Sequence, residues 1–198
     1  MKLETLQARL IAVPPCLTPT RSDYDLNPNV RPAAARPLVP AAVLVPIVTR
    51  TEPTVLFTRR STALKRHAGQ VSFPGGRADP TDTSLTATAL RELLEETGID
   101  PAFVTVAGFL DPYETITGFA VLPVVGLVDP GFSLAPDARE VAAVFEVPLA
   151  FLLDPDNCRT EEVELQGRKR RFYAFQYQSH YIWGATAAML KALAGRLR

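Results

Sequence analysis

The sequence predicts an α/β fold in a single globular domain. Short apolar, β-branched stretches alternate along the chain with stretches whose apolar residues recur at helical spacing. The chain has 198 residues, of which 47% are hydrophobic and 21% are charged, so it can bury one good core but has no room for a second domain. Lys plus Arg equals Asp plus Glu, at 21 each, and this balance favours neither nucleic acid nor an anionic membrane as a partner.

The first 40 residues are predicted to form a short helix followed by a proline-rich arm. Leu3, Leu6 and Leu10 recur at helical spacing, which predicts a helix over Lys2–Ala12. Nine of the 18 prolines lie between residues 14 and 53, and this density indicates an extended segment. Such an arm would either pack on a partner subunit or form a loosely ordered leader.

Membrane insertion and secretion are not expected. The apolar run Val39–Val48 is short and is broken by two prolines, so it does not predict a membrane span. Cys16 and Cys158 are too few for a disulfide framework and lack metal-ligand spacing. A cytoplasmic protein with reduced thiols is the expectation.

The stretch Gly75–Asp100 combines a glycine pair, a helix and a cluster of acidic residues. On a helix of about 3.6 residues per turn, Glu92, Glu95 and Glu96 fall within an arc of roughly 100°. The helix is expected to begin at Thr83 or Ser84 and to end at Gly98. Its opposite side is predicted to face the core and carries Ala87, Leu90, Leu93 and Leu94.

Three carboxylates near the end of a helix repel one another and the negative end of the helix dipole. A bound cation would relieve this repulsion, and oxygen ligands alone suit Mg²⁺ or Mn²⁺. Arg91 can pair with Glu95 four residues later and hold it in place. The alternative interpretation is a solvated acidic helix face with an ordinary Arg–Glu pair.

The end of this stretch resembles the Nudix box, in which Arg-Glu, two residues, Glu-Glu, one residue and Gly-apolar follow one another. The matching residues are Arg91, Glu92, Glu95, Glu96, Gly98 and Ile99. The segment before it, Leu56–Gly76, resembles the signature of the coenzyme A pyrophosphatase branch of that superfamily. The residues that match in place are Leu56, Thr58, Arg60, Ser61, Gly69, Val71, Phe73, Pro74, Gly75 and Gly76.

A dense group of basic residues precedes the box in a chain that is otherwise neutral. Next to Gly75 and Gly76, which allow close approach of a ligand to the backbone, it predicts a binding site for a polyanion. A solvated loop is the alternative, although a bridged pyrophosphate would need both metals and cations. The basic residues are Arg59, Arg60, Lys65, Arg66 and His67, and Lys65 stands where the branch has an arginine.

The first half of the box departs from the family pattern. The general pattern has a Glu eight residues before the Arg, whereas this chain has Asp82 nine residues before Arg91. One residue is therefore inserted and the loop must bulge. We predict that Asp82 braces the loop or caps the helix and takes no part in catalysis.

After the box, strands are predicted over Val104–Phe109 and Phe119–Leu127, and a short helix over Val147–Leu153. A hairpin is expected from Glu161–Glu164 and Arg171–Gln178, and a last helix over 182–197. By the branch pattern, Glu140 is preferred to Glu146 as an extra metal ligand or base. A surface role for Glu140 is the alternative.

The resemblance implies a Nudix fold, a mixed β-sheet sandwiched between α-helices, over residues 41–198, after a leader of residues 1–40. It implies a metal site made by Glu92, Glu95, Glu96 and Gly76, with Arg91 and Glu140 completing the catalytic set. The implied reaction is hydrolysis of the diphosphate bond of coenzyme A or acyl-CoA, giving 3′,5′-ADP and 4′-phosphopantetheine or its acyl form. Alternatives are another nucleoside diphosphate derivative (ADP-ribose, a dinucleotide or a nucleoside triphosphate) as substrate, or a non-catalytic module that senses a nucleotide. By analogy the chain could also form a homodimer.

Overall fold

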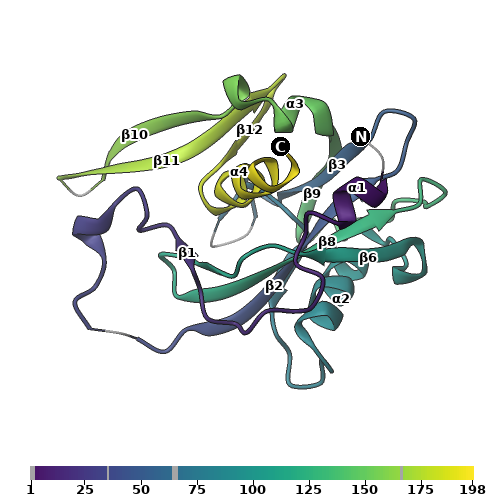
Figure 1. The fold of residues 1–198 in the computed structure, drawn as a ribbon, viewed down its shortest axis with the longest axis horizontal. Helices are drawn as coiled ribbons and strands as arrows, with labels where there is room; N and C mark the ends of the chain where they lie inside the picture. Colours follow the sequence, from purple (N-terminus) through teal and green to yellow (C-terminus); the bar gives the residue numbers. More distant parts are fainter. Residues whose placement is uncertain (1–2, 35, 64–66, 166) are drawn as a thin grey trace.

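The computed structural model describes residues 3–34, 36–63, 67–165 and 167–198. Figure 1 shows a large sheet with α2 on one side and α4 and a smaller sheet on the other. The helices are α1 (Leu3–Gln7), α2 (Leu85–Thr97), α3 (Leu149–Leu153) and α4 (Ala185–Leu197), with 3₁₀ turns η1 (Pro28–Val30), η2 (Pro101–Phe103) and η3 (Pro155–Asn157). The strands are β1 (Arg21–Ser22), β2 (Val39–Val48), β3 (Thr54–Arg60), β4 (Val71–Ser72), β5 (Gly75–Arg77), β6 (Val104–Phe109), β7 (Tyr113–Glu114), β8 (Phe119–Val128), β9 (Val141–Pro148), β10 (Arg159–Leu165), β11 (Arg168–Tyr177) and β12 (His180–Trp183).

The parallel pair β2 and β8 forms the centre of a mixed nine-stranded sheet. The two strands pair from Val39 beside Phe119 to Val48 beside Val128. Both are nearly continuous apolar runs, which is typical of strands buried on both faces. β3 and β5 pair antiparallel with β2, β6 and β7 with β8, and β4 and β9 with β3, while β1 joins β7 in parallel. The smaller sheet has the antiparallel order β10-β11-β12.

Neighbouring residues of β2 enter two different cores. Leu44 belongs to the same buried cluster as Leu93 of α2, whereas Val45 belongs to the cluster that contains Leu190 of α4. Because successive side chains of a strand point to opposite faces, one strand supplies both layers. The predicted α/β class, with a mixed sheet between helices, is confirmed.

The two ends of α2 agree with the prediction. Ser84 caps the helix, since its Oγ accepts a hydrogen bond of 3.1 Å from the N–H of Ala87. The helix ends where Gly98 adopts a left-handed φ of 76°. The loop-helix-loop expected from the sequence is therefore present.

The predicted core-facing side of α2 is only partly right. Leu93 is fully buried, but Leu94 is 45% exposed. The buried line of the helix runs through Ala89, Leu93 and Glu96, at i, i+4 and i+7. Glu96, predicted to lie on an acidic stripe with Glu92 and Glu95, is only 2% exposed because it points at the sheet.

The predicted N-terminal helix is too long. It ends at Gln7, and Ile11 instead exchanges backbone hydrogen bonds with Phe109 of β6, at 3.1 and 2.9 Å. Leu6 and Leu10 nevertheless enter the core that lies between β2 and α4. The division at residue 40 stays a prediction, although these two leucines share a core with the later strands.

The start of the last helix is also predicted wrongly. Ile182 pairs with Phe175 in β12, and α4 begins only at Ala185 after a turn at Gly184, where φ is 66°. Similarly, Val147 belongs to β9 and α3 begins after it. The strands predicted after the box agree with β6 and β8, and the predicted hairpin agrees with β10 and β11, with ends shifted by a few residues.

The described part of the proline-rich arm packs on its own chain, which neither interpretation of the sequence foresaw. β1 pairs with β7 at one edge of the large sheet. Asn27 reaches the smaller sheet, where its Nδ2 donates to the carbonyl of Arg171 and its Oδ1 accepts from the N–H of Arg171, both at 2.8 Å. The arm therefore joins the two sheets.

Replacing Asn27 by alanine should lower the free energy of unfolding by about 1–3 kcal/mol, because the two hydrogen bonds of the buried Asn27 side chain to the backbone of Arg171 are lost. Urea unfolding would measure the change. Asn157→Ala is a matched control, since Asn157 Nδ2 makes one bond of 3.0 Å to the carbonyl of Phe151. Equal losses in the two variants would contradict the bridging role of Asn27.

Candidate active site

The three predicted carboxylates of α2 differ widely in burial. Glu95 has 56% of its side chain exposed, whereas Glu92 keeps 15% and Glu96 only 3%. Burial raises the pKa of Glu96 to about 7, and the nearby charges of Glu92 and Glu140 add to the effect. Burial also raises the pKa of Glu92, partly offset by Arg91. The charge of Glu140 therefore acts on both Glu92 and Glu96.

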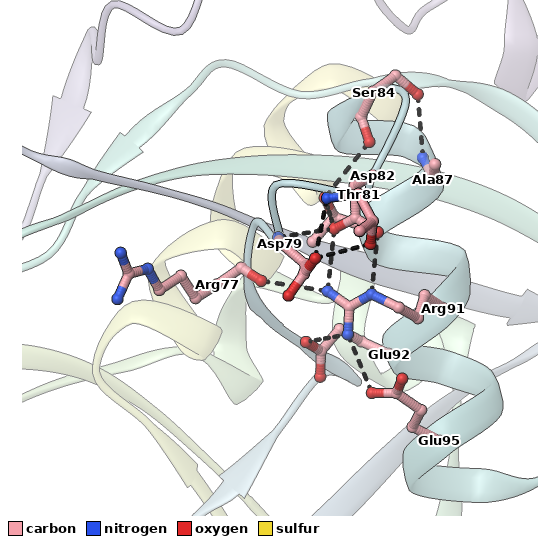
Figure 2. A network of polar contacts seen from close by, with 10 residues as sticks. Arg77, Asp79, Thr81, Asp82, Ser84, Ala87, Arg91, Glu92 and Glu95 are labelled. Carbon is pink, nitrogen blue, oxygen red and sulfur yellow. Dashed lines mark hydrogen bonds and ion pairs between the residues drawn. The ribbon is translucent and has the colours of Figure 1, made fainter.

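Arg91 lies between these carboxylates and the loop that precedes the helix (Figure 2). Its Nη1 donates to Glu92 Oε1 at 2.8 Å and to Glu95 Oε2 at 2.9 Å. The predicted pair between Arg91 and Glu95 is therefore confirmed. Figure 2 shows the opposite side of the same guanidinium turned towards Asp82.

Asp82 braces the loop, as predicted. Arg91 donates to both of its oxygens, from Nε at 2.9 Å and from Nη2 at 3.0 Å. Thr88 Oγ1 and the N–H of Asp79 add bonds of 2.8 and 2.9 Å. The bonds from Arg91 hold the pKa of Asp82 well below its ordinary value. Asp82 therefore reaches Arg91 in spite of the inserted residue and the change from Glu to Asp. Arg91 in turn contacts Glu92 and Glu95, two of the metal ligands predicted on α2.

Gly76 and Gly75 both lie in close contacts. A Cβ at Gly76 would overlap the carboxylate of Glu92 in its present position. At Gly75 it would lie 2.6 Å from the carbonyl oxygen of Ala42 in β2. Glycine at position 76 therefore lets the backbone of β5 lie close to the Glu92 carboxylate, and glycine at position 75 lets β5 pair closely with β2.

Two residues of β3 lie next to the Glu96 carboxylate. Thr58 Oγ1 donates to Glu96 Oε2 at 3.1 Å, and Arg60 Nη1 lies 3.8 Å from Oε1. Thr58 and Arg60 are two residues apart on one strand, so their side chains share a face. Sequence analysis did not predict the contact between Thr58 and Glu96. The alternation of side chains along a strand over residues 56–60 could have predicted it, because it places Thr58 on the same face as Arg60.

Arg59 and Arg60, which were predicted to belong to one basic patch, lie on opposite faces of β3. Arg59 alternates to the other face of β3, where its charge helps burial to lower the pKa of His180. His180 stacks on Phe145, with ring centroids 3.6 Å apart, and Phe145 stacks on Phe57 of β3. Arg59 therefore belongs to the layer that contains the smaller sheet, whereas Arg60 faces α2.

The loop after β3 is partly described. His67 is exposed and its Nδ1 lies 2.7 Å from Gln70 Oε1. Lys65 and Arg66, both predicted to bind substrate, lie outside the described residues. Among the predicted basic residues, Arg60 is thus the one that the structure brings to the carboxylates of α2.

Glu140 and Glu146 have different surroundings. Glu146 accepts two bonds from Arg50, at 2.8 and 2.7 Å, and a further one from Thr54. Glu140 is exposed at the start of β9, and its backbone carbonyl accepts a 2.7 Å bond from the N–H of Ser61. The register between β3 and β9 shifts nearby, between the pairs Arg59–Ala143 and Arg60–Val141. Glu146 is thus paired with Arg50, whereas the charge of Glu140 acts on Glu96.

Residues 38–176 match the family model of the NUDIX domain. The chain belongs to the Nudix family. An uncharacterized Nudix hydrolase, NudL, from Photorhabdus laumondii is 48% identical over 80% of this chain and 84% of its own length. The NudL protein of Pectobacterium atrosepticum is 44% identical over 88% of this chain and 90% of its own length.

A solved structure has a similar fold. The DR0079 protein from Deinococcus radiodurans superimposes with a TM-score of 0.51 and 11% identity, covering 82% of this chain and 87% of that protein. At this identity the likeness concerns the fold alone. No helix in the described ranges is long and apolar enough to cross a bilayer.

The residues of the Nudix helix fit a divalent cation. Glu92 and Glu96 are buried carboxylates whose ionised forms are disfavoured, and a bound cation would stabilise those forms. Carboxylate oxygens are the donors that Mg²⁺ and Mn²⁺ prefer. Within the part of the chain that the structure describes, no three acidic, His or Cys side chains form a ready-made cage. Arg91 donates hydrogen bonds to Glu92 and Glu95, and Thr58 donates one to Glu96.

Proposed function

We propose that this Nudix hydrolase cleaves the diphosphate bond of coenzyme A or acyl-CoA with the help of Mg²⁺ or Mn²⁺. The products are 3′,5′-ADP and 4′-phosphopantetheine or its acyl form. The observation that carries the proposal is the buried Glu96 carboxylate of the Nudix helix, with the guanidinium of Arg60 3.8 Å away and Glu92 on the same helix. Diphosphate hydrolysis needs such a combination of anionic ligands and a cation.

Each residue of this group has a separate task. Glu92, Glu95 and Glu96, with the backbone at Gly76, would hold the divalent cation, which polarises phosphoryl oxygens and acidifies a water when bound. Arg91 fixes Glu92 and Glu95 while Asp82 holds Arg91 from behind. The carboxylates are therefore oriented before substrate arrives.

Arg60 and Glu140 act on the substrate side. Arg60 neutralises the charge that develops on the phosphoryl oxygens. Its Nε is buried and makes no hydrogen bond to any residue that the structure describes, which leaves a donor for an anion. Glu140 serves as an extra ligand or as the base that takes a proton from the attacking water.

The choice of coenzyme A rests on the segment before the box. Its match to the coenzyme A pyrophosphatase signature spans the β3 strand, the basic loop and the glycines of β5. Arg60 and His67, with Lys65 and Arg66, are the proposed contacts to the phosphates. Arg59 faces the opposite layer and stays a prediction from the sequence, as do the homodimer and the cytoplasmic location.

Hydrolysis of coenzyme A in ¹⁸O-labelled water with Mg²⁺ tests this proposal. We expect 3′,5′-ADP and 4′-phosphopantetheine as products. The ¹⁸O label should appear in the product that contains the phosphorus attacked by water. ADP-ribose, a dinucleotide and a nucleoside triphosphate should be hydrolysed more slowly in parallel reactions. Equal rates for these compounds would refute the substrate but not the chemistry. If the wild type proves as inert as Glu96→Gln while binding a nucleotide, the protein is a sensor.

A further inference from the structure

We propose that Thr58 is a positioning residue that sets the direction of the Glu96 carboxylate. The inference rests on the proposed function, because it takes Glu96 to be a ligand of the divalent cation. Thr58 lies in β3 and Glu96 in α2, so the contact joins the sheet to the helix. Its Oγ1 is 3.1 Å from Glu96 Oε2.

Both partners of this hydrogen bond are buried. Thr58 is 0% exposed and Glu96 is 2% exposed. A hydroxyl has one hydrogen, and an ionised carboxylate can only accept. Towards the ionised carboxylate, Thr58 is the donor, and its 3.1 Å contact with Glu96 is shorter than its contacts with Ser72 of β4, which are 3.4 Å to Oγ and 3.5 Å to the backbone carbonyl. The hydroxyl group of Thr58 in β3 thus contacts both the Glu96 carboxylate and the hydroxyl group of Ser72 in β4.

The contact fixes which oxygen of Glu96 faces the site. Thr58 donates its hydrogen bond to Oε2, and Oε1 faces Arg60, whose Nη1 is 3.8 Å away. A glutamate side chain has three rotatable bonds, so a helix alone holds its carboxylate poorly. The Thr58 hydroxyl, by contrast, is one bond from Cβ and stands on a strand paired on both sides. Thr58 thus transmits the rigidity of the sheet to Glu96.

If Thr58 had only a structural role, its substitution would have a different effect on cation binding. If the hydroxyl only satisfied its own hydrogen bond, valine or serine in its place would change stability and leave cation binding alone. If it orients the ligand, serine should replace it and valine should not. Partners that hold a metal ligand are typically worth about 10–100-fold in metal affinity.

A titration of the full chain with Mn²⁺ in the absence of substrate separates these outcomes. The electron paramagnetic resonance signal of free Mn²⁺ reports how much of the ion is bound. We expect Thr58→Val to bind Mn²⁺ about 10–100-fold more weakly and to lose kcat for coenzyme A with little change in KM. Thr58→Ser should bind like the wild type. Thr97→Val is the matched control, because Thr97 is equally buried and its Oγ1 donates within the helix to the carbonyl of Leu93 at 2.6 Å.

Two results would overturn the inference. One is a Thr58→Val protein that binds Mn²⁺ as tightly as the wild type. The other is a Thr58→Ser protein that binds as weakly as Thr58→Val. If Thr58→Val does not fold, as judged by circular dichroism, Thr58→Ala compared with Thr97→Ala gives the same reading. If the wild type binds Mn²⁺ and hydrolyses diphosphates and Thr58→Val does so equally well, this inference alone is refuted. If the wild type neither binds Mn²⁺ nor hydrolyses diphosphates, the proposed function is refuted as well.

Discussion

Replacing Glu96 by glutamine should lower kcat/KM for coenzyme A by about 10²–10⁴-fold. A metal ligand supplies several kcal/mol of charge stabilisation in the transition state, and about 1.4 kcal/mol corresponds to a factor of ten. Glutamine has nearly the same shape and can still accept from Thr58, so the loss reports the missing charge. Steady-state hydrolysis with saturating Mg²⁺ measures it. A residual activity above one tenth of wild type would contradict a direct role for Glu96.

The same substitution should make the metal-free protein more stable at high pH. The pKa of Glu96 is raised to about 7 because burial disfavours its charged form. In the unfolded chain a glutamate titrates near about 4.3. Below that pH the group is protonated in both states and the folded protein has its full stability. As pH rises through the folded pKa, the buried group must ionise and stability is lost.

Thermal unfolding with EDTA at pH 5 and pH 8 checks this sign. Glu96→Gln should match the wild type at pH 5 and exceed it at pH 8, by about 1 to 3 kcal/mol. Glu95→Gln is the control, because the exposed Glu95 makes a surface pair with Arg91 worth about 1 kcal/mol or less. Adding Mg²⁺ at pH 8 should stabilise the wild type more than Glu96→Gln. A glutamine variant that is less stable than wild type at pH 8 would contradict the burial argument.

The burial of Glu96 shows what sequence can and cannot predict about α2. The angles between Glu92, Glu95 and Glu96 follow from helix geometry, and so do the cap at Ser84 and the stop at Gly98. Which side of the helix rests on the sheet depends on tertiary contacts, and Thr58 draws Glu96 to that side. A carboxylate in a nearly apolar interface is the kind of local conflict found at functional sites.

Long-range pairing explains the other errors. Ile182 was assigned to a helix because the residues after it are helical, yet it pairs with Phe175 across the β11–β12 hairpin. Ile11 likewise pairs with Phe109, which lies far away in the sequence. Local periodicity carries no information about such partners. Asp82, by contrast, was predicted correctly, because the distance to Arg91 along the chain already constrains the loop.

The two adjacent arginines of β3 provide the sharpest test of the site geometry. Arg60→Ala should lower kcat for coenzyme A by about 10²–10³-fold, the loss that follows removal of one group that stabilises developing charge. Arg59→Ala is the matched control on the opposite face. An exposed charge contact is worth about 1 kcal/mol or less, so its effect should stay below about tenfold. Steady-state kinetics of both variants with the same substrate gives the comparison.

Metal binding separates the role of Arg60 from that of Thr58. Arg60 lies 3.8 Å from Glu96 and carries the same sign of charge as the cation, so its removal takes away a repulsion. Arg60→Ala should therefore bind Mn²⁺ at least as tightly as the wild type while hydrolysing poorly, the opposite of the weak binding expected for Thr58→Val. Equal kinetic losses in Arg59→Ala and Arg60→Ala would mean that substrate reaches both faces of β3. Weaker Mn²⁺ binding in Arg60→Ala would mean that Arg60 acts by holding Glu96 and not by contacting the phosphates.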